Sequence, residues 1–431
     1  MIPEIIILGV LCACACALPG NFLVLRRMSM MGDAISHAVL PGIVIAYLVL
    51  GSRSSIPMLV GAVLAGVFTT FLTELLHRKA KVEESTSMGV VFTTLFALGI
   101  FLVTKEAGHV DLDVDCVLYG SLEVLAYDLY SGTFFILVGV LIINALFIAL
   151  FFKELKLTSF DEQLADTLGF SSQLMHHLLM GLVAITTVAA FEAVGSILVI
   201  AMLVVPPATA RLFTDRLSTQ ILLSLLIASG CAIIGHAAAI YLPQLLGFSD
   251  TITSGMMATT AGVIYLAALL FAPRYGTLSK ARHRKNMNRK LVREDVLGLM
   301  YRAQENGQPA AAAWLSDSLM LPEPQLSMAL AELRKTEQIE GEEAALTLLP
   351  AGLEAGRKLI QSHRLWESYI HKHFELPIDH LHASAEQLEH VTDAPMLERL
   401  RDEVDDPELD PMGKAIPNTE ASKPNTKPPS S

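Results

Sequence analysis

The sequence predicts an all-α polytopic membrane domain of about 8–9 transmembrane helices, followed by a soluble and mostly helical domain. Of 431 residues, 52% are apolar and only 17% are charged, and nearly all long apolar runs fall in residues 5–273. Residues 1–293 hold 19 basic and 18 acidic residues, whereas 294–431 hold 12 and 25, a net charge of −13. A neutral membrane part and an acidic soluble part, here called the tail, follow from this split.

The first part contains a series of apolar runs, several of them close to the roughly 20 residues that a spanning helix needs. They cover approximately residues 5–25, 35–51, 57–76, 88–103, 131–152, 176–190, 194–212, 219–243 and 253–273. Pro19 and the pair Pro206-Pro207 predict kinks or breaks in their helices. Only three residues separate 176–190 from 194–212, which allows one of them to be a broken or re-entrant element.

Lysine and arginine predict the orientation of these spans, because cytoplasmic loops carry an excess of them. The basic residues cluster at 26–27, 78–81, 153–156, 211–216 and 274–293. The alternate connections contain few, and the 105–123 loop carries three aspartates instead. Nine spans with the N-terminus outside and the C-terminus in the cytoplasm fit this alternation.

The stretch from Arg26 to Gly42 opens the second apolar run and contains an ionisable pair. Asp33 and His37 are four residues apart, so they share one face of a helix. Ionisable side chains at a membrane entrance are costly and indicate a functional site. Two ligands plus water suit an ion in transit, which must leave as well as enter. We therefore expect Asp33 and His37 to line a path for manganese, iron or zinc, the alternative being a hydrogen-bonded structural pair.

The cytoplasmic connection 153–175 predicts a short amphipathic helix. Ser159 can cap a helix whose first turn contains Asp161 and Glu162, and Gly169 can end it. Leu164 and Leu168 lie on one face of that helix. We interpret it as a docking surface for a soluble partner, with an ordinary solvated loop as the alternative.

The tail predicts helices at 291–306, 310–320 and 325–335, strand-like pieces around Gly341, and helices at 353–374 and 380–390. A helix, a helix-turn-helix and a hairpin in this order are typical of a winged helix. The predicted domains are therefore a transmembrane part at 1–275, a basic linker at 276–293, and a soluble domain with a winged helix at 294–403. Residues 404–431 are expected to form a disordered tail end.

Candidate metal ligands gather on two tail helices. The four residues His382, Glu386, Glu389 and His390 fall at helical spacing on one helix, and His363 and Glu367 do so on the preceding one. Imidazole and carboxylate without cysteine favour manganese or iron(II) over a tight structural zinc site. The alternative is a solvated polar face.

Motifs for catalysis are absent from the sequence. It contains no Gly-x-x-x-x-Gly-Lys-Ser/Thr loop, no nucleophile elbow and no zincin helix. We therefore expect no enzyme activity and no bound nucleotide, so that active transport requires a separate ATPase.

The segment Leu23–Gly42 closely resembles the signature segment of permease subunits of bacterial ABC importers for manganese, zinc and iron. Glu192–Leu212 is similar to a second segment of that family, and Ser159–Gly169 resembles its coupling segment; the resemblance runs over about residues 5–275. It implies a bacterial inner-membrane protein, a homo- or heterodimeric permease core, a cytoplasmic ABC ATPase and an extracytoplasmic metal-binding protein. It also implies that Asp33 and His37 line the ion path. The implied ATPase-coupling residues are Phe160, Asp161, Leu164, Ala165, Leu168 and Gly169.

Residues 291–416 resemble diphtheria-toxin-repressor-type metal-dependent regulators of the manganese-sensing branch. The likeness is visible at Leu346–Gly352, at 362–367 and at 388–390. It implies metal ligands at Asp295, His363, Glu386, Glu389 and His390, with Glu367 and His382 nearby. Two positions depart from the pattern: Gly298 stands where that branch carries a Glu ligand, and residues 410–413 lack the usual His before Gly.

These observations predict a permease subunit for divalent metal, manganese before zinc or iron, with a metal-sensing or regulatory tail. One alternative is a membrane-tethered, metal-dependent transcription regulator whose tail binds DNA in place or after release. The charge of the tail argues against it, because DNA affinity depends on Lys and Arg, and the candidate recognition helix Gln325–Lys335 has basic residues only at its end. A second alternative is a tail that only stabilises permease dimers.

Overall fold

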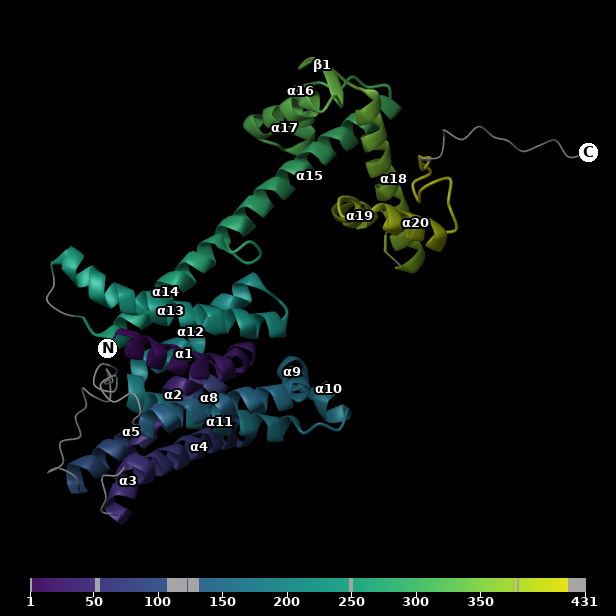
Figure 1. Cartoon of the computed structure of the whole chain (residues 1–431). Coiled ribbons are helices and arrows are strands. Elements are labelled where there is room, and N and C mark those ends of the chain that lie inside the picture. The colour runs from purple at the N-terminus through teal and green to yellow at the C-terminus, as the bar shows by residue number, and fades with distance from the viewer. Residues whose placement is uncertain are drawn as a thin grey trace, which may run out of the picture. The chain divides into compact units, whose positions relative to one another are not determined.

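The computed structural model describes residues 2–50, 55–106, 122, 132–247, 251–374, 376–377 and 380–417. Its contacts divide the chain into two compact units, Met1–Lys280 and Ala281–Ser431. The first unit is a bundle of helices, and the second combines helices with one small hairpin (Figure 1). The predicted fold class, a helical membrane part followed by a mostly helical soluble domain, is confirmed.

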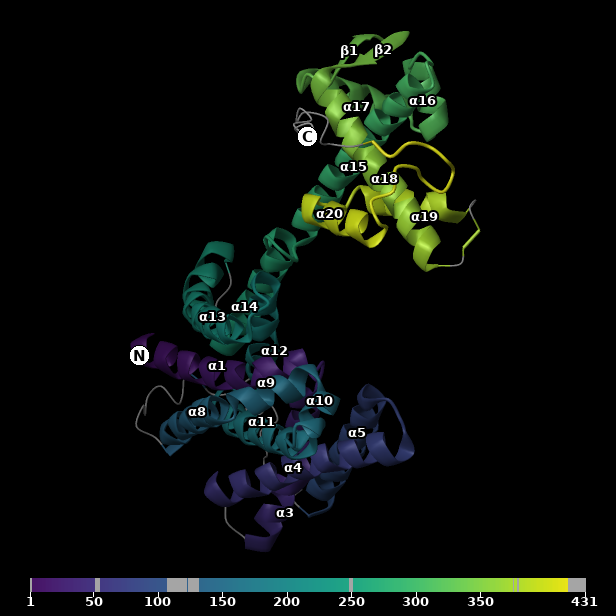
Figure 2. The same cartoon turned by 90° about the vertical axis from the view of Figure 1, so that its right-hand side faces the viewer.

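Within the described residues, nine helical segments are long and apolar enough to cross a membrane, as the apolar runs predicted. They are formed by α1 (Ile2–Leu25), α2 (Met31–Ala38) with α3 (Leu40–Leu50), α4 (Ser55–Ala80), α5 (Glu84–Glu106), α8 (Gly132–Leu150), α11 (Ser172–Val194), α12 (Ser196–Phe213), α13 (Leu217–Leu246) and α14 (Thr253–Phe271). Two shorter helices, α9 (Phe152–Phe160) and α10 (Glu162–Thr167), lie between α8 and α11 and contact α11 (Figure 2). The chain is a multi-pass membrane protein.

The second span is divided into two helices, which the hydropathy pattern alone does not reveal. Helix α2 ends at Ala38 and α3 begins at Leu40, with Pro41 in the first turn of α3. Proline has no N–H to donate and is tolerated in the first turn of a helix, which is consistent with a new helix that begins at Leu40. Gly42 of α3 faces Gly61 of α4 so closely that a Cβ on either residue would overlap the other's backbone oxygen. Small residues permit this close packing of membrane helices.

The prolines of the membrane unit do not break their helices. Helix α1 continues through Pro19, and α12 continues through Pro206 and Pro207. A single residue, Gly195, separates α11 from α12, and its backbone angles of φ 81° and ψ 165° are accessible essentially to glycine alone. Each of these two helices is by itself long and apolar enough to cross a membrane.

Buried amides join the membrane helices. Asn21 of α1 donates from Nδ2 to Ser224 Oγ at 2.8 Å, and its Oδ1 accepts from Gln220 of α13 at 3.3 Å. Asn144 of α8 donates to the backbone oxygen of Ala15 at 2.8 Å. Hydrogen bonds between helices replace the hydrophobic driving force that a lipid environment removes. They hold α1 between α8 and α13.

The second unit contains a helical scaffold and a two-stranded hairpin. Its elements are α15 (Thr277–Glu305), α16 (Ala312–Leu319), α17 (Glu323–Lys335), β1 (Ile339–Glu342), β2 (Ala345–Leu348), α18 (Pro350–His373), α19 (Leu381–Glu389) and α20 (Ala394–Glu403). The strands pair antiparallel with Ile339 opposite Leu348, and Gly341 takes a φ of 102°. One apolar core joins α15, α16, α17 and the hairpin, and a second joins α18, α19 and α20.

The tail differs from expectation in three places. The basic stretch 276–293, expected to be a linker before the first tail helix, is helical from Thr277 and forms the first half of α15. Helix α20 was not predicted at all. Residues 404–417, expected to begin a disordered end, instead return to α18, where Arg364 contacts Asp410 and the backbone oxygen of Ala415. The acidic composition of this stretch hid these specific partners; residues 418–431 lie outside the described residues.

Candidate metal centres

The membrane unit places Asp33 and His37, here called the pore pair, on successive turns of α2. His37 Nε2 lies 3.4 Å from Asp33 Oδ1, and the two side chains are 37% and 30% exposed within the chain. The His37 ring lies 5.6 Å from the ring of Phe96 and 6.2 Å from that of Phe92, both on α5. Helix α2 also contacts α4, α11 and α12. The pair therefore offers one oxygen and one nitrogen ligand beside an aromatic wall.

The tail brings together a first group of ligands around the buried His363. Its Nε2 lies 3.0 Å from Glu367 Oε1 and 2.8 Å from His382 Nδ1. Glu367 Oε1 and His382 Nδ1 are 3.1 Å apart. His363 and Glu367 come from α18 and His382 from α19, so the packing of these two helices assembles the group. One ligand atom from each residue lies within 4.8 Å of the others, which suits a divalent ion.

A second group lies next to the first. His390 Nε2 is 3.0 Å from Asp295 Oδ1 of α15 and 3.7 Å from Glu389 Oε1, and these ligand atoms also fall within 4.8 Å of one another. Glu294 Oε2 accepts a hydrogen bond from His390 Nδ1 at 2.9 Å. Such an outer carboxylate is the usual way to orient an imidazole ligand. Nitrogen and oxygen donors without sulfur fit manganese, iron(II) or zinc.

Glu389 is shared by the two groups. Its Oε2 lies 2.5 Å from His363 Nδ1 and its Oε1 faces His390. Its side chain is 5% exposed, and that of His363 is 3% exposed. A carboxylate buried between two imidazoles needs their positive charge or a metal ion to offset its desolvation. The donor set and its burial thus fit the metal that the sequence led us to expect.

The carboxylates also control protonation in the tail. Burial lowers the pKa of His363, but its hydrogen bonds to the Glu367 and Glu389 carboxylates outweigh burial and hold that pKa above its usual value. Burial also lowers the pKa of His390, and there the hydrogen bonds that its ring donates to Asp295 and Glu294 raise the pKa to about 10. His390 therefore favours the protonated form without metal, the carboxylates shift His363 in the same direction, and an incoming ion has to displace such protons.

One residue expected among the tail ligands lies apart from both groups. Glu386 lies on α19 one turn before Glu389, but its side chain is exposed and it belongs to neither group. The four residues at helical spacing therefore do not all converge in this structure. Gly298 is buried on α15, where an added Cβ would lie 2.9 Å from Leu359 Cδ2. Leu359 therefore packs where the Glu ligand implied by the resemblance would begin.

The segment Ser159–Phe170, here called the coupling segment, presents apolar side chains. Phe160, Leu164 and Leu168 are exposed, whereas Ala165 is fully buried on the inner side of the segment. Gly169 takes a φ of 89° directly after the turn. Asp161, not Ser159, caps α10, because its Oδ1 accepts from the Leu164 N–H at 2.9 Å. The Ser159 hydroxyl instead accepts from Arg26 Nε at 3.1 Å.

A third group was missed by the sequence analysis. Glu74 of α4 and the neighbouring His176 and His177 of α11 each place one ligand atom within 4.8 Å of the others. They are about a hundred residues apart in the chain, so no spacing rule joins them. The only feature that could have found them is a pair of histidines at the start of an apolar span.

Comparison with known protein families assigns both parts of the chain. Residues 1–272 match the model of the ABC 3 transport family, and residues 349–418 match that of the iron dependent repressor, metal binding and dimerisation domain. The two matches coincide with the membrane helices and with the part of the tail that contains His363, Glu389 and His390.

Individual relatives resemble the membrane part. The manganese transport system membrane protein MntD of Bacillus subtilis is 43% identical over 293 residues, covering 66% of this chain and 97% of the relative. The zinc transport system membrane protein TroD of Treponema pallidum is 41% identical, covering 65% and 76%. Among solved structures, PsaBC from Streptococcus pneumoniae in complex with Fab superposes with a TM-score of 0.53 at 30% identity, covering 63% of this chain and 92% of that one.

Proposed function

The chain belongs to the ABC 3 transport family, and we propose that it is the permease subunit of an ATP-driven importer for a divalent transition metal. Manganese is the proposed substrate, ahead of zinc and iron(II), in line with the manganese transport of the relative MntD. The observation that carries the proposal is the pore pair on α2, an acid and an imidazole 3.4 Å apart within a bundle of membrane helices.

The chemistry of the pore pair suits transit. Two protein ligands leave most coordination positions of the ion to water or to a delivering protein, so binding is weak enough for release. The aromatic rings of Phe92 and Phe96 limit the water around His37 on one side. A carboxylate and an imidazole accept manganese, iron(II) and zinc and give little selectivity among them.

The proposed partners follow from the architecture. The coupling segment exposes Phe160, Leu164 and Leu168, and exposed apolar groups on a short helix are what a docking ATPase would cover. An extracytoplasmic metal-binding protein would deliver the ion, and a second permease subunit would complete the path. We place the C-terminus in the cytoplasm of a bacterial inner membrane, because the basic connections alternate accordingly.

The test is uptake of radioactive manganese and zinc by cells that express the permease with its ATPase and binding protein. Asp33→Ala with His37→Ala is expected to abolish uptake at normal membrane levels. The matched control replaces the exposed Glu83 and His283 by alanine and is expected to transport normally. Unchanged uptake in the pore-pair variant would remove the ligand assignment. Absence of uptake in the wild type would favour the tethered-regulator alternative.

We assign the tail a regulatory role: metal bound by His363, Glu389, His390 and their neighbours reports cytosolic metal and adjusts transport. The support is the burial of this donor set and its shared carboxylate. DNA binding is not part of the proposal. Two basic side chains of α15, Arg289 and Arg293, face Glu332 of the candidate recognition helix α17 at 3.9 and 3.5 Å.

A further inference from the structure

A cavity of about 500 Å³ lies where four segments of the membrane unit meet. It is lined by the residues after α1, the end of α4, the coupling segment and the start of α11. The basic residues Arg26, Arg27 and Arg78, which come from two separate clusters in the sequence, all contribute to this lining. By the positive-inside rule this is the cytoplasmic end of the bundle. Met31 of α2 also lines the cavity, two residues before Asp33.

Two potential metal ligands, Glu74 and His176, line this cavity, and His177 lies beside Glu74; the three residues are here called the Glu74 cluster. His177 Nδ1 lies 2.9 Å from Glu74 Oε2, and His176 Nε2 lies 3.8 Å from the same oxygen. Glu74 and His176 are 12% and 17% exposed, and His177 is 42% exposed. Two imidazoles and one carboxylate with room for water form an open transition-metal site. Helices α4 and α11, which carry the cluster, both contact α2, which carries the pore pair.

We propose that the Glu74 cluster is a second, transient divalent-metal site at which the imported ion pauses before it enters the cytoplasm. This proposal rests on the proposed import function. The surrounding charge suits a short stay, because Arg78 Nε lies 2.7 Å from the other oxygen of Glu74. A cation beside the ligands weakens metal affinity, as release requires.

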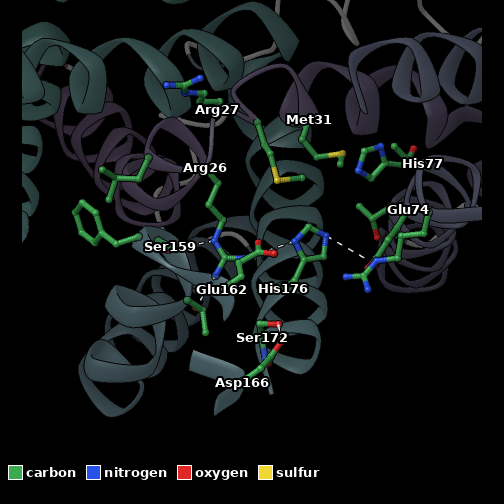
Figure 3. Close-up of a pocket in the computed structure, with 17 residues that line it drawn as sticks. Arg26, Arg27, Met31, Glu74, His77, Ser159, Glu162, Asp166, Ser172 and His176 are labelled. Carbon is green, nitrogen blue, oxygen red and sulfur yellow. Dashed lines mark hydrogen bonds and ion pairs between the residues drawn. The ribbon is translucent and has the colours of Figure 1, made fainter. Parts of the chain in front are cut away.

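Arg26 links this site to the coupling segment (Figure 3). Its Nη2 donates to Thr158 Oγ1 at 2.8 Å and its Nε donates to Ser159 Oγ at 3.1 Å. Its Nη1 lies 3.5 Å from His176 Nδ1. Figure 3 shows His176 between Arg26 on one side and Glu74 on the other. A displacement of α9 would therefore move Arg26 relative to His176.

The contact with Arg26 determines whether His176 can bind metal. A guanidinium can only donate, so Nδ1 of His176 accepts and the proton of the neutral ring sits on Nε2, the atom that faces Glu74. A protonated Nε2 cannot coordinate an ion. Withdrawal of Arg26 lets the ring proton move to Nδ1 and leaves Nε2 free as a ligand. The position of the coupling segment thus controls the completeness of the site.

The test measures Co(II) binding, through its ligand-field absorption, by the purified permease–ATPase complex. The background carries Asp33→Ala, His37→Ala, His363→Gln and His390→Gln, so that the pore pair and the tail do not contribute. Glu74→Gln and His177→Gln are each expected to weaken Co(II) binding at least about tenfold. Arg26→Gln is expected to tighten it several-fold, and Glu83→Gln, an exposed position, is expected to leave it unchanged.

Arg78→Gln separates a metal site from a structural ion pair. If Glu74 only pairs with Arg78, then Glu74→Gln and Arg78→Gln will change Co(II) binding equally. If Glu74 binds metal, Arg78→Gln retains or tightens Co(II) binding. The proposal is overturned if the Glu74→Gln and His177→Gln variants bind Co(II) as tightly as the background protein. It is also overturned if Arg78→Gln loses as much Co(II) binding as Glu74→Gln does. In the otherwise native chain, Glu74→Gln is expected to lower manganese uptake about tenfold. Absence of wild-type uptake would refute the import function alone, because Co(II) binding is measured independently.

Discussion

The pore pair and the tail groups use the same ligand types in opposite surroundings. Asp33 and His37 are about one-third exposed, and each offers a single ligand atom. His363 and Glu389 are almost fully buried, and α15, α18 and α19 bring further ligands to them. Few ligands and open access favour passage, whereas many buried ligands favour retention. This difference supports the proposal that the first site conducts the ion and the second senses it.

The largest expected effect that sharpens this comparison is on the tail. His363→Gln removes the imidazole between Glu367 and Glu389 and is expected to weaken Mn(II) binding by the tail about 100-fold. Electron paramagnetic resonance of Mn(II), on purified protein that also carries Asp33→Ala and His37→Ala, measures this. His371→Gln, at an exposed position of α18, is the control. In cells, His363→Gln alone should leave uptake capacity intact but remove its response to cytosolic metal. If Mn(II) binding by the tail and the response of uptake to cytosolic metal both persist in this variant, the tail is not a sensor.

The pH dependence of tail binding is expected to be next in size. Metal must displace protons from His363 and His390, whose pKa values are raised, in the second case to about 10. Affinity for Mn(II) should therefore rise with pH between 6 and 8, by up to about tenfold per unit for each proton released. Titrations at several pH values measure this slope. A flat profile would show that these imidazoles are not ligands.

The metal-free tail should respond to pH in the opposite direction. The raised pKa of His390 contributes stability that is fully present below its usual value of 6.5 and is lost as pH rises toward about 10. Amide hydrogen exchange in α18 and α19 should therefore become faster with pH, after correction for intrinsic exchange, and metal should suppress this trend. A metal-free tail that gains protection with rising pH would contradict the charge assignment.

The smallest expected effect comes from a substitution that adds a ligand to the pore pair, so that the pair holds the metal longer. The Phe96 ring lies 5.6 Å from that of His37, so Phe96→His would add a third ligand, a second imidazole, beside the pair. Slower release is expected to lower manganese uptake about threefold while more metal stays bound to the purified protein. Phe96→Leu controls for the loss of the aromatic ring. Faster uptake with Phe96→His would show that the pair lacks ligands for its task.

The sequence was sufficient wherever structure depends on local pattern. Apolar length located the nine candidate spans among the described residues, and periodicity and breakers located the tail helices other than α20 and the first half of α15. Prediction from the sequence failed where a residue far away in the chain determines the contact of a side chain. Ser159 fits an N-cap rule, but Arg26, 133 residues away, takes its hydroxyl. Glu386 fits the spacing of its neighbours, but the packing of α19 on α18 turns it outward. The Glu74 cluster exists only because α4 and α11 pack together.

Glu389 has a consequence for how metal occupancy of the tail should be quantified. One of its oxygens faces the His363 group and the other faces the His390 group. An ion that fixes this carboxylate in one group alters the free energy of filling the other, and the alteration is equal in both directions. The two groups form one thermodynamic unit. A binding isotherm of the tail therefore describes the pair, with a coupling free energy as its third parameter, and no single dissociation constant belongs to either group alone.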